Sequence, residues 1–116
     1  MIENSPANNA ADIAEESNVR WHIRKLVSDA YEELYQKILE FSKAGLRSWY
    51  MNAYHTPQYK RWWRMFFRPE CEWSDEAGIA YSIPASSIRM SLVVELRSKG
   101  FMVECDCADE TVVIKW

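Results

Sequence analysis

The sequence predicts a single α+β domain, with a helical N-terminal part that contains one long helix, then a small antiparallel sheet with one further helix and a C-terminal β-hairpin. Two patterns carry this prediction: apolar residues at helical spacing between residues 19 and 44, and alternating apolar residues over 101–116. A chain of 116 residues with 48% hydrophobic content has enough apolar surface for one core.

The long helix is indicated by apolar residues that recur every three or four positions from Val19 to Phe41, and Gly45 is placed to end it. Residues 1–18 contain four acids, no base and few large apolar side chains. They are therefore predicted to form a flexible acidic arm, in which Ser5 and Pro6 could start a short helix, and residues 19–116 form the domain.

Two shorter helices are predicted next. The first covers Leu46 to Tyr54, where apolar residues again follow helical spacing. The second begins after Thr56 and Pro57 and runs to about Phe67, before the stop at Pro69. Its two sides differ, because the rings and the cations fall on opposite faces, and the ring side is expected to face the core. The rings belong to Tyr59, Trp62, Trp63, Phe66 and Phe67.

The last third is predicted to contain strands over 70–73 and 79–83, a helix from Ala85 that ends at Gly100, and a hairpin of residues 101–107 and 111–116. In the hairpin, Cys105 and Cys107 share the phase of Phe101 and Val103. They are therefore expected to be buried core thiols.

A basic, aromatic segment, residues 43–68, is the most unusual feature, because no acidic residue occurs between Glu40 and Glu70 in a chain of net charge −3. Interleaved rings and cations suit single-stranded nucleic acid, whose bases stack while its phosphates pair with the cations. The helical separation of rings from cations favours a core-facing aromatic stripe with a solvated basic side, and after that a basic surface that contacts a negatively charged partner surface, over base stacking. The candidate partner-binding residues are Arg47, Lys60, Arg61, Arg64 and Arg68.

No catalytic residue, metal site or cofactor is predicted. The three glycines cannot form a phosphate-binding loop, and the cysteines and histidines lack the paired spacing of a zinc site. An odd number of cysteines indicates a reducing compartment, and no apolar run is long enough for a membrane span. A cytoplasmic protein without a membrane partner is expected.

The stretch from Ile83 to Trp116 resembles an ending shared by many small bacteriophage-encoded accessory proteins. The shared features are Leu-Arg-x-x-Gly-Phe-x-Val, which spans 96–103, an acidic turn, and a final Ile-x-Trp strand over 114–116. The resemblance covers the last third of the chain and carries over no binding residue. It implies a phage or prophage product, and such products commonly bind and redirect host proteins.

The expected function is therefore a non-enzymatic, phage-type protein that binds a host protein with an acidic surface and inhibits, for instance, an antiviral defence or nucleic-acid enzyme. One alternative is a nucleic-acid-binding protein that uses segment 43–68. Another is a virion or assembly component that forms a homo-oligomer through exposed aromatic residues.

Overall fold

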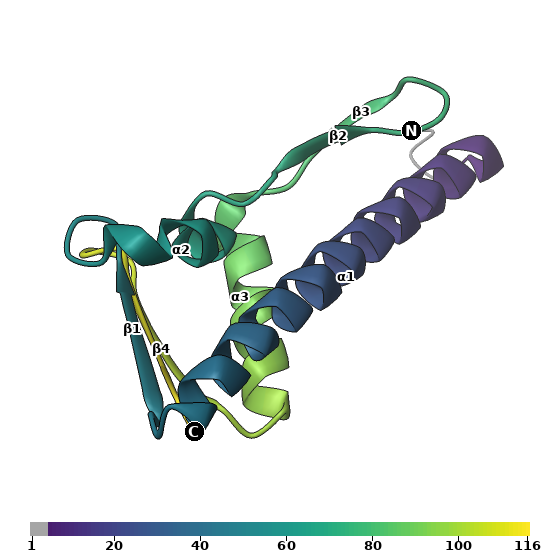
Figure 1. Ribbon diagram of the computed structural model, residues 1–116. Coiled ribbons are helices and arrows are strands. Elements are labelled where there is room, and N and C mark those ends of the chain that lie inside the picture. Colours follow the sequence, from purple (N-terminus) through teal and green to yellow (C-terminus); the bar gives the residue numbers. More distant parts are fainter. Residues whose placement is uncertain (1–4) are drawn as a thin grey trace.

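The computed structural model describes residues 5–116 and confirms the α+β class (Figure 1). A long helix is followed by short helical and extended segments, and strands recur near the C-terminus. In chain order the elements are α1 (Pro6–Lys43), β1 (Ser48–Asn52), the 3-10 turn η1 (Pro57–Tyr59), α2 (Lys60–Phe67), β2 (Glu72–Ser74), β3 (Ala80–Ser82), α3 (Ala85–Ser98), β4 (Met102–Asp106) and β5 (Thr111–Lys115).

Helix α1 begins earlier than its apolar pattern indicates. The Ser5 hydroxyl accepts a hydrogen bond from the Asn8 amide (3.3 Å), and Pro6 occupies the first helical position. The predicted boundary between residues 18 and 19 therefore falls inside a continuous helix of 38 residues. Residues 1–4 of the predicted arm lie outside the described part of the chain. The helix ends as expected before Gly45, whose φ is +85°.

The helix predicted over Leu46–Tyr54 is wrong, because residues 48–52 form strand β1. Trp49 and Met51 point into the core while Tyr50 between them is 44% exposed, which is the alternation of a strand. A short apolar run fits both periods, and tertiary pairing decides between them. Here β5 supplies the partner, with Trp49 opposite Ile114 and Met51 opposite Val112.

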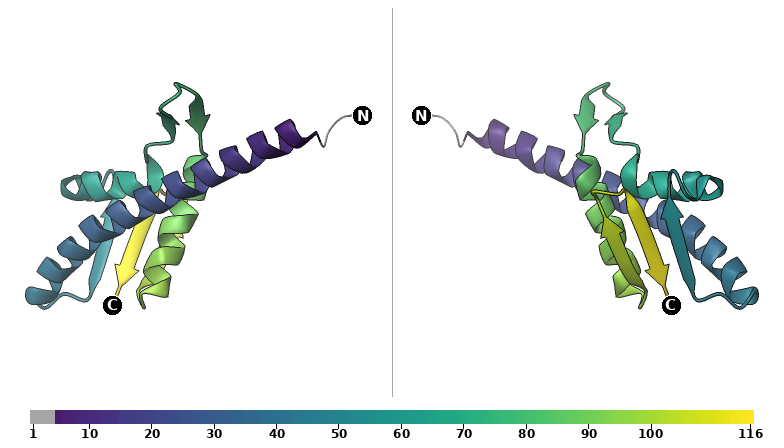
Figure 2. Two further views of the ribbon diagram at one scale, coloured as in Figure 1. Left: turned by 90° about the vertical axis from the view of Figure 1, so that its right-hand side faces the viewer. Right: turned by 90° about the vertical axis from the view of Figure 1, so that its left-hand side faces the viewer.

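The main sheet has the strand order β1-β5-β4, all antiparallel, so the predicted C-terminal hairpin forms its centre and one edge. The three helices lie on one face of this sheet, and the other face is uncovered (Figure 2). Leu34 of α1, Phe66 of α2 and Leu96 of α3 meet Val112 and Ile114 of β5 in one fully buried core.

The predicted strand–loop–strand segment forms a separate two-stranded sheet, β2 and β3, with Trp73 opposite Tyr81. Its strands are shorter than predicted. The predicted helix before Gly100 is α3, and the Phe101 amide donates to the Leu96 carbonyl (3.1 Å) beyond its end.

The ring side of α2 faces the core, as predicted. Trp63, Phe66 and Phe67 are buried, and Tyr59 and Trp62 are half-buried against the same cluster.

The expectation of two buried hairpin cysteines is wrong for Cys107, which is exposed, while Cys105 is half-buried beside the core. Strand β4 ends at Asp106, so Cys107 lies in the turn and no longer follows the strand alternation.

Candidate functional site

Helix α2 exposes Lys60 and Arg64, and Arg68 follows at its end, next to the buried ring of Trp63. Lys60, Arg64 and Arg68 follow one another at intervals of four residues, so they lie along one edge of the helix. Together they line an open groove of about 630 Å³, here called the basic groove. Its remaining lining residues are Ala53, Tyr54, Trp63 and Glu110.

The loop that forms one wall of the basic groove is held by Asn52, a buried polar residue with 4% exposure. Its amide nitrogen donates to the carbonyl oxygen of Asp109 (3.1 Å) and to the Thr111 hydroxyl (2.9 Å). Its amide oxygen accepts from the backbone of Tyr54 (2.8 Å) and His55 (3.1 Å). The side chain of Asn52 thus joins the loop after β1 to the β4–β5 turn and fixes where Tyr54 stands.

Helix α2 is tied to the same β4–β5 turn. The Trp63 indole nitrogen donates to the backbone carbonyl of Glu110 (2.7 Å), and the Arg68 guanidinium lies 5.5 Å above the Trp63 ring. Arg68 also pairs with the Glu110 carboxylate (3.0 Å). Since Glu110 is the one acid that lines the groove and is already paired, the groove retains a positive charge from Lys60 and Arg64.

The structure brings together three of the five predicted binding residues. Arg61 lies on the same helix but faces α1, where it pairs with Glu33 (3.2 Å). Arg47 lies before β1 and donates to the Trp116 carbonyl (3.2 Å), so the length of β1, about 15 Å, separates it from the groove. The candidate site is therefore Lys60, Arg64 and Arg68.

Sequence reasoning missed Tyr54, whose side chain is 85% exposed at the groove. It also missed Asn52 and Glu110, which hold the groove's walls. The segment 52–57, Asn-Ala-Tyr-His-Thr-Pro, carries an Asn and a Thr-Pro pair that are typical of a turn, and this signal could have placed Tyr54 in a loop.

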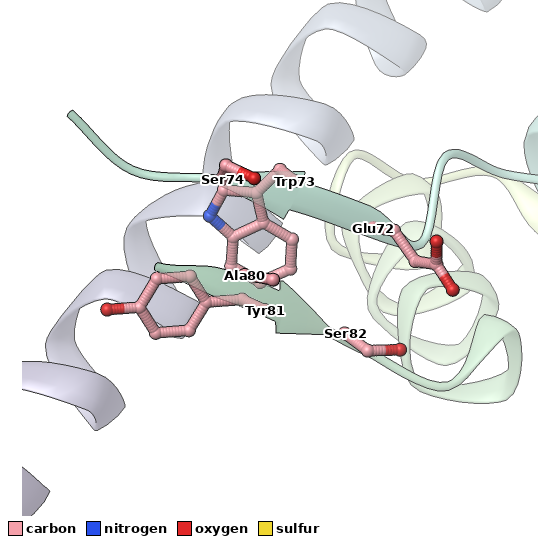
Figure 3. A pocket seen from close by; sticks show the side chains of 6 residues that line it. All are labelled: Glu72, Trp73, Ser74, Ala80, Tyr81 and Ser82. Carbon is pink, nitrogen blue, oxygen red and sulfur yellow. The ribbon is translucent and has the colours of Figure 1, made fainter. Parts of the chain in front are cut away.

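A second hollow lies on the β2–β3 hairpin, whose first strand begins four residues after Arg68. It measures about 440 Å³ and is lined by residues of the two strands, among which the Trp73 and Tyr81 rings lie side by side (Figure 3). The rings are nearly parallel, with centroids 5.3 Å apart. No charged residue other than Glu72 lines this hollow, so it offers a ligand few directional contacts.

Among the described residues there is no group of three or more His, Cys, Asp or Glu side chains that could hold a metal ion. None of the helices in residues 5–116 has the length and apolar content to cross a membrane. No family model, no curated protein and no solved structure matches the chain.

Proposed function

We propose that the protein is a non-enzymatic, phage-type protein that binds a host protein through the basic groove, at an acidic surface of that partner. The observation that carries the proposal is the division of α2: its rings are packed in the core, while Lys60, Arg64 and Arg68 face solvent. Such a surface attracts a partner by charge and leaves few rings free for stacking. An enzyme of host defence or nucleic-acid metabolism is the kind of partner that the phage-like C-terminal ending suggests.

A nucleic acid is the second candidate, and the exposed ring of Tyr54 beside Lys60 and Arg64 favours it. A base could stack on Tyr54 while phosphates contact the two cations. The Glu110 carboxylate within the same groove opposes either kind of negatively charged partner. A single free ring gives only a short stacking platform, and this favours the protein partner.

The test is affinity purification from a bacterial lysate with the wild-type chain and with the Lys60→Glu/Arg64→Glu variant as baits. A captured acidic protein should be lost with this variant, because two attractive charges become repulsive. The matched control is Lys43→Glu/Lys115→Glu, which makes the same charge change at two exposed residues away from the groove. Equal loss with both variants would attribute capture to net charge and would refute the basic groove as the site.

A gain-of-affinity variant sharpens the test. Glu110→Gln removes the groove's only acid and frees Arg68, so the association rate with an acidic partner should rise, most strongly at low salt. Arg68 is exposed and Glu110 is partly exposed, so stability should change by less than about 1 kcal/mol. In parallel, mixed-sequence DNA should bind weakly. Tight DNA binding that weakens steeply with salt and disappears in Lys60→Glu/Arg64→Glu would favour the second candidate.

A further inference from the structure

The N-terminal half of α1 extends past the main sheet, and the β2–β3 hairpin lies beside it (Figures 1 and 2). This extension gives the molecule its elongated shape of 60 × 27 × 26 Å. The hairpin does not pair with the main sheet, so its position depends on α1 and on the two chain segments that lead into it.

A stack of three rings attaches the hairpin to α1. His22 lies parallel to Trp73 with centroids 3.8 Å apart, and Trp73 lies against Tyr81 on its strand partner. The Trp73 indole nitrogen also donates to the Asn18 side chain (3.4 Å). The hairpin is thus held to α1 by the stacking of Trp73 and Tyr81 on His22, the residue that follows Trp21.

Between α1 and the hairpin lies an open groove of about 530 Å³, here called the hairpin groove. Trp21, which is 61% exposed, and Trp73 provide its apolar walls, while Asp75 and Glu76 stand at its rim. The other lining residues are Ser17, Asn18 and Ser74. A large exposed indole in a groove is a common anchor for a partner.

Acidic residues predominate around the hairpin groove, although α1 also carries Arg20 and Lys25 beside Trp21. Residues 5–18 and 70–82 together contain seven acidic residues and no basic residue. The Asp75 carboxylate accepts hydrogen bonds from the Ile79 amide (2.9 Å) and the Tyr81 hydroxyl (3.0 Å), and these bonds, the first above all, lower its pKa. The groove therefore keeps its negative charge, and Glu76 forms no ion pair within residues 5–116.

We propose that the hairpin groove binds an arginine-containing segment of a partner protein. A guanidinium can stack on an indole face and pair with a carboxylate through two parallel hydrogen bonds, and both groups are present here in Trp21 and Glu76. Trp21 already accepts a cation, since Lys25 Nζ lies 5.4 Å from its ring centre. Charge complementarity thus selects a basic protein segment. This surface is separate from the basic groove and does not depend on the proposed function.

The experiment measures binding of the full chain to a labelled peptide of alternating arginine and serine by fluorescence anisotropy, at low and at physiological salt. Two probes of the same length replace arginine by lysine or by citrulline, which has arginine's shape without its charge. We expect the arginine peptide to bind most tightly, with an affinity that falls as salt rises. Citrulline binding as tight as arginine, or lysine binding as tight as arginine, would overturn the proposal.

The site is located with paired variants. Trp21→Ala/Glu76→Gln should weaken arginine-peptide binding about five- to tenfold. The control Met102→Ala/Glu104→Gln also removes one exposed apolar side chain and one exposed carboxylate, but on β4, and should leave binding unchanged. Both variants change exposed side chains, and circular dichroism confirms their fold. Equal weakening by the two variants would refute the hairpin groove as the site.

Analytical ultracentrifugation of the free protein separates a partner protein from a second copy of this chain. The cations of the basic groove of one molecule could pair with the carboxylates of the hairpin groove of another molecule. A monomer supports the proposal. An oligomer that becomes monomeric in Trp21→Ala/Glu76→Gln would assign the hairpin groove to self-association and overturn it.

Discussion

Substitution of Trp63 by alanine tests whether the ring side of α2 is part of the core, on which the presentation of Lys60 and Arg64 depends. Trp63 is 4% exposed, packs against Phe67 with centroids 5.4 Å apart, and donates to the Glu110 carbonyl. The substitution removes the whole indole, its packing and this hydrogen bond.

The expected loss of stability is about 3–5 kcal/mol, the usual effect of a buried Trp→Ala substitution. Trp63→Phe keeps a ring against Phe67 but loses the hydrogen bond to Glu110 and some volume, so it should lose about 1–2 kcal/mol. Trp21→Ala is the matched control, because the same substitution at a 61% exposed residue should change stability by less than about 0.5 kcal/mol.

Urea denaturation followed by far-ultraviolet circular dichroism measures all three variants without relying on tryptophan fluorescence, to which six residues contribute. In a thermal melt, Trp63→Ala should lower the midpoint by roughly 10–20 °C. A loss below about 1 kcal/mol for Trp63→Ala, or equal losses at Trp63 and Trp21, would refute the burial of the ring side of α2.

Three further predictions concern other parts of the chain. Asn52→Ala should lose about 2–4 kcal/mol in urea denaturation, because the buried amide makes four hydrogen bonds; a loss under about 1 kcal/mol would contradict its role as the link between loop and turn. Burial lowers the pKa of His22 from its ordinary value of 6.5, so the unfolded chain binds more protons than the folded chain as the pH falls through that value. The thermal midpoint should therefore drop as the pH falls from 7 through 6.5, and His22→Phe should remove this component; an unchanged pH profile would disprove it. Iodoacetamide should alkylate Cys107 before Cys105, because Cys107 is exposed and burial raises the pKa of the Cys105 thiol; mass spectrometry of timed samples would reveal the reverse order.

Local sequence patterns were sufficient to predict the elements whose apolar spacing fits only one type of secondary structure. The apolar stripe from Val19 to Phe41 is too long for a strand, and the alternation over 101–116 is too regular for a helix. In α2, the separation of rings from cations follows from the helical period alone, so the burial of Trp63 and the exposure of Arg64 were both predictable.

Two features required information that local patterns lack. The apolar pattern of residues 46–54 fits a helix or a strand. Residues 48–52 form a strand because they pair with the free edge of β5, which lies about 60 residues away in the sequence. The start of α1 was underestimated because residues 6–18 have little apolar surface, although the Ser5–Pro6 cap was recognisable. The groove at Tyr54 needed the whole tertiary arrangement, since its walls come from three separate segments.

The two grooves rest on different supports, and this difference affects how binding would act on the molecule. The basic groove is fixed by buried hydrogen bonds of Asn52 and Trp63 to the turn of the central hairpin, so its geometry is set before a partner arrives. The hairpin groove depends on the stack of His22 and Trp73 on a half of α1 that lies beyond the main sheet. A segment with few buried contacts opens locally at a small free-energy cost, and a ligand that binds only the closed form suppresses that opening. Binding at the hairpin groove would therefore order the hairpin, whereas binding at the basic groove would leave the local stability of the hairpin unchanged.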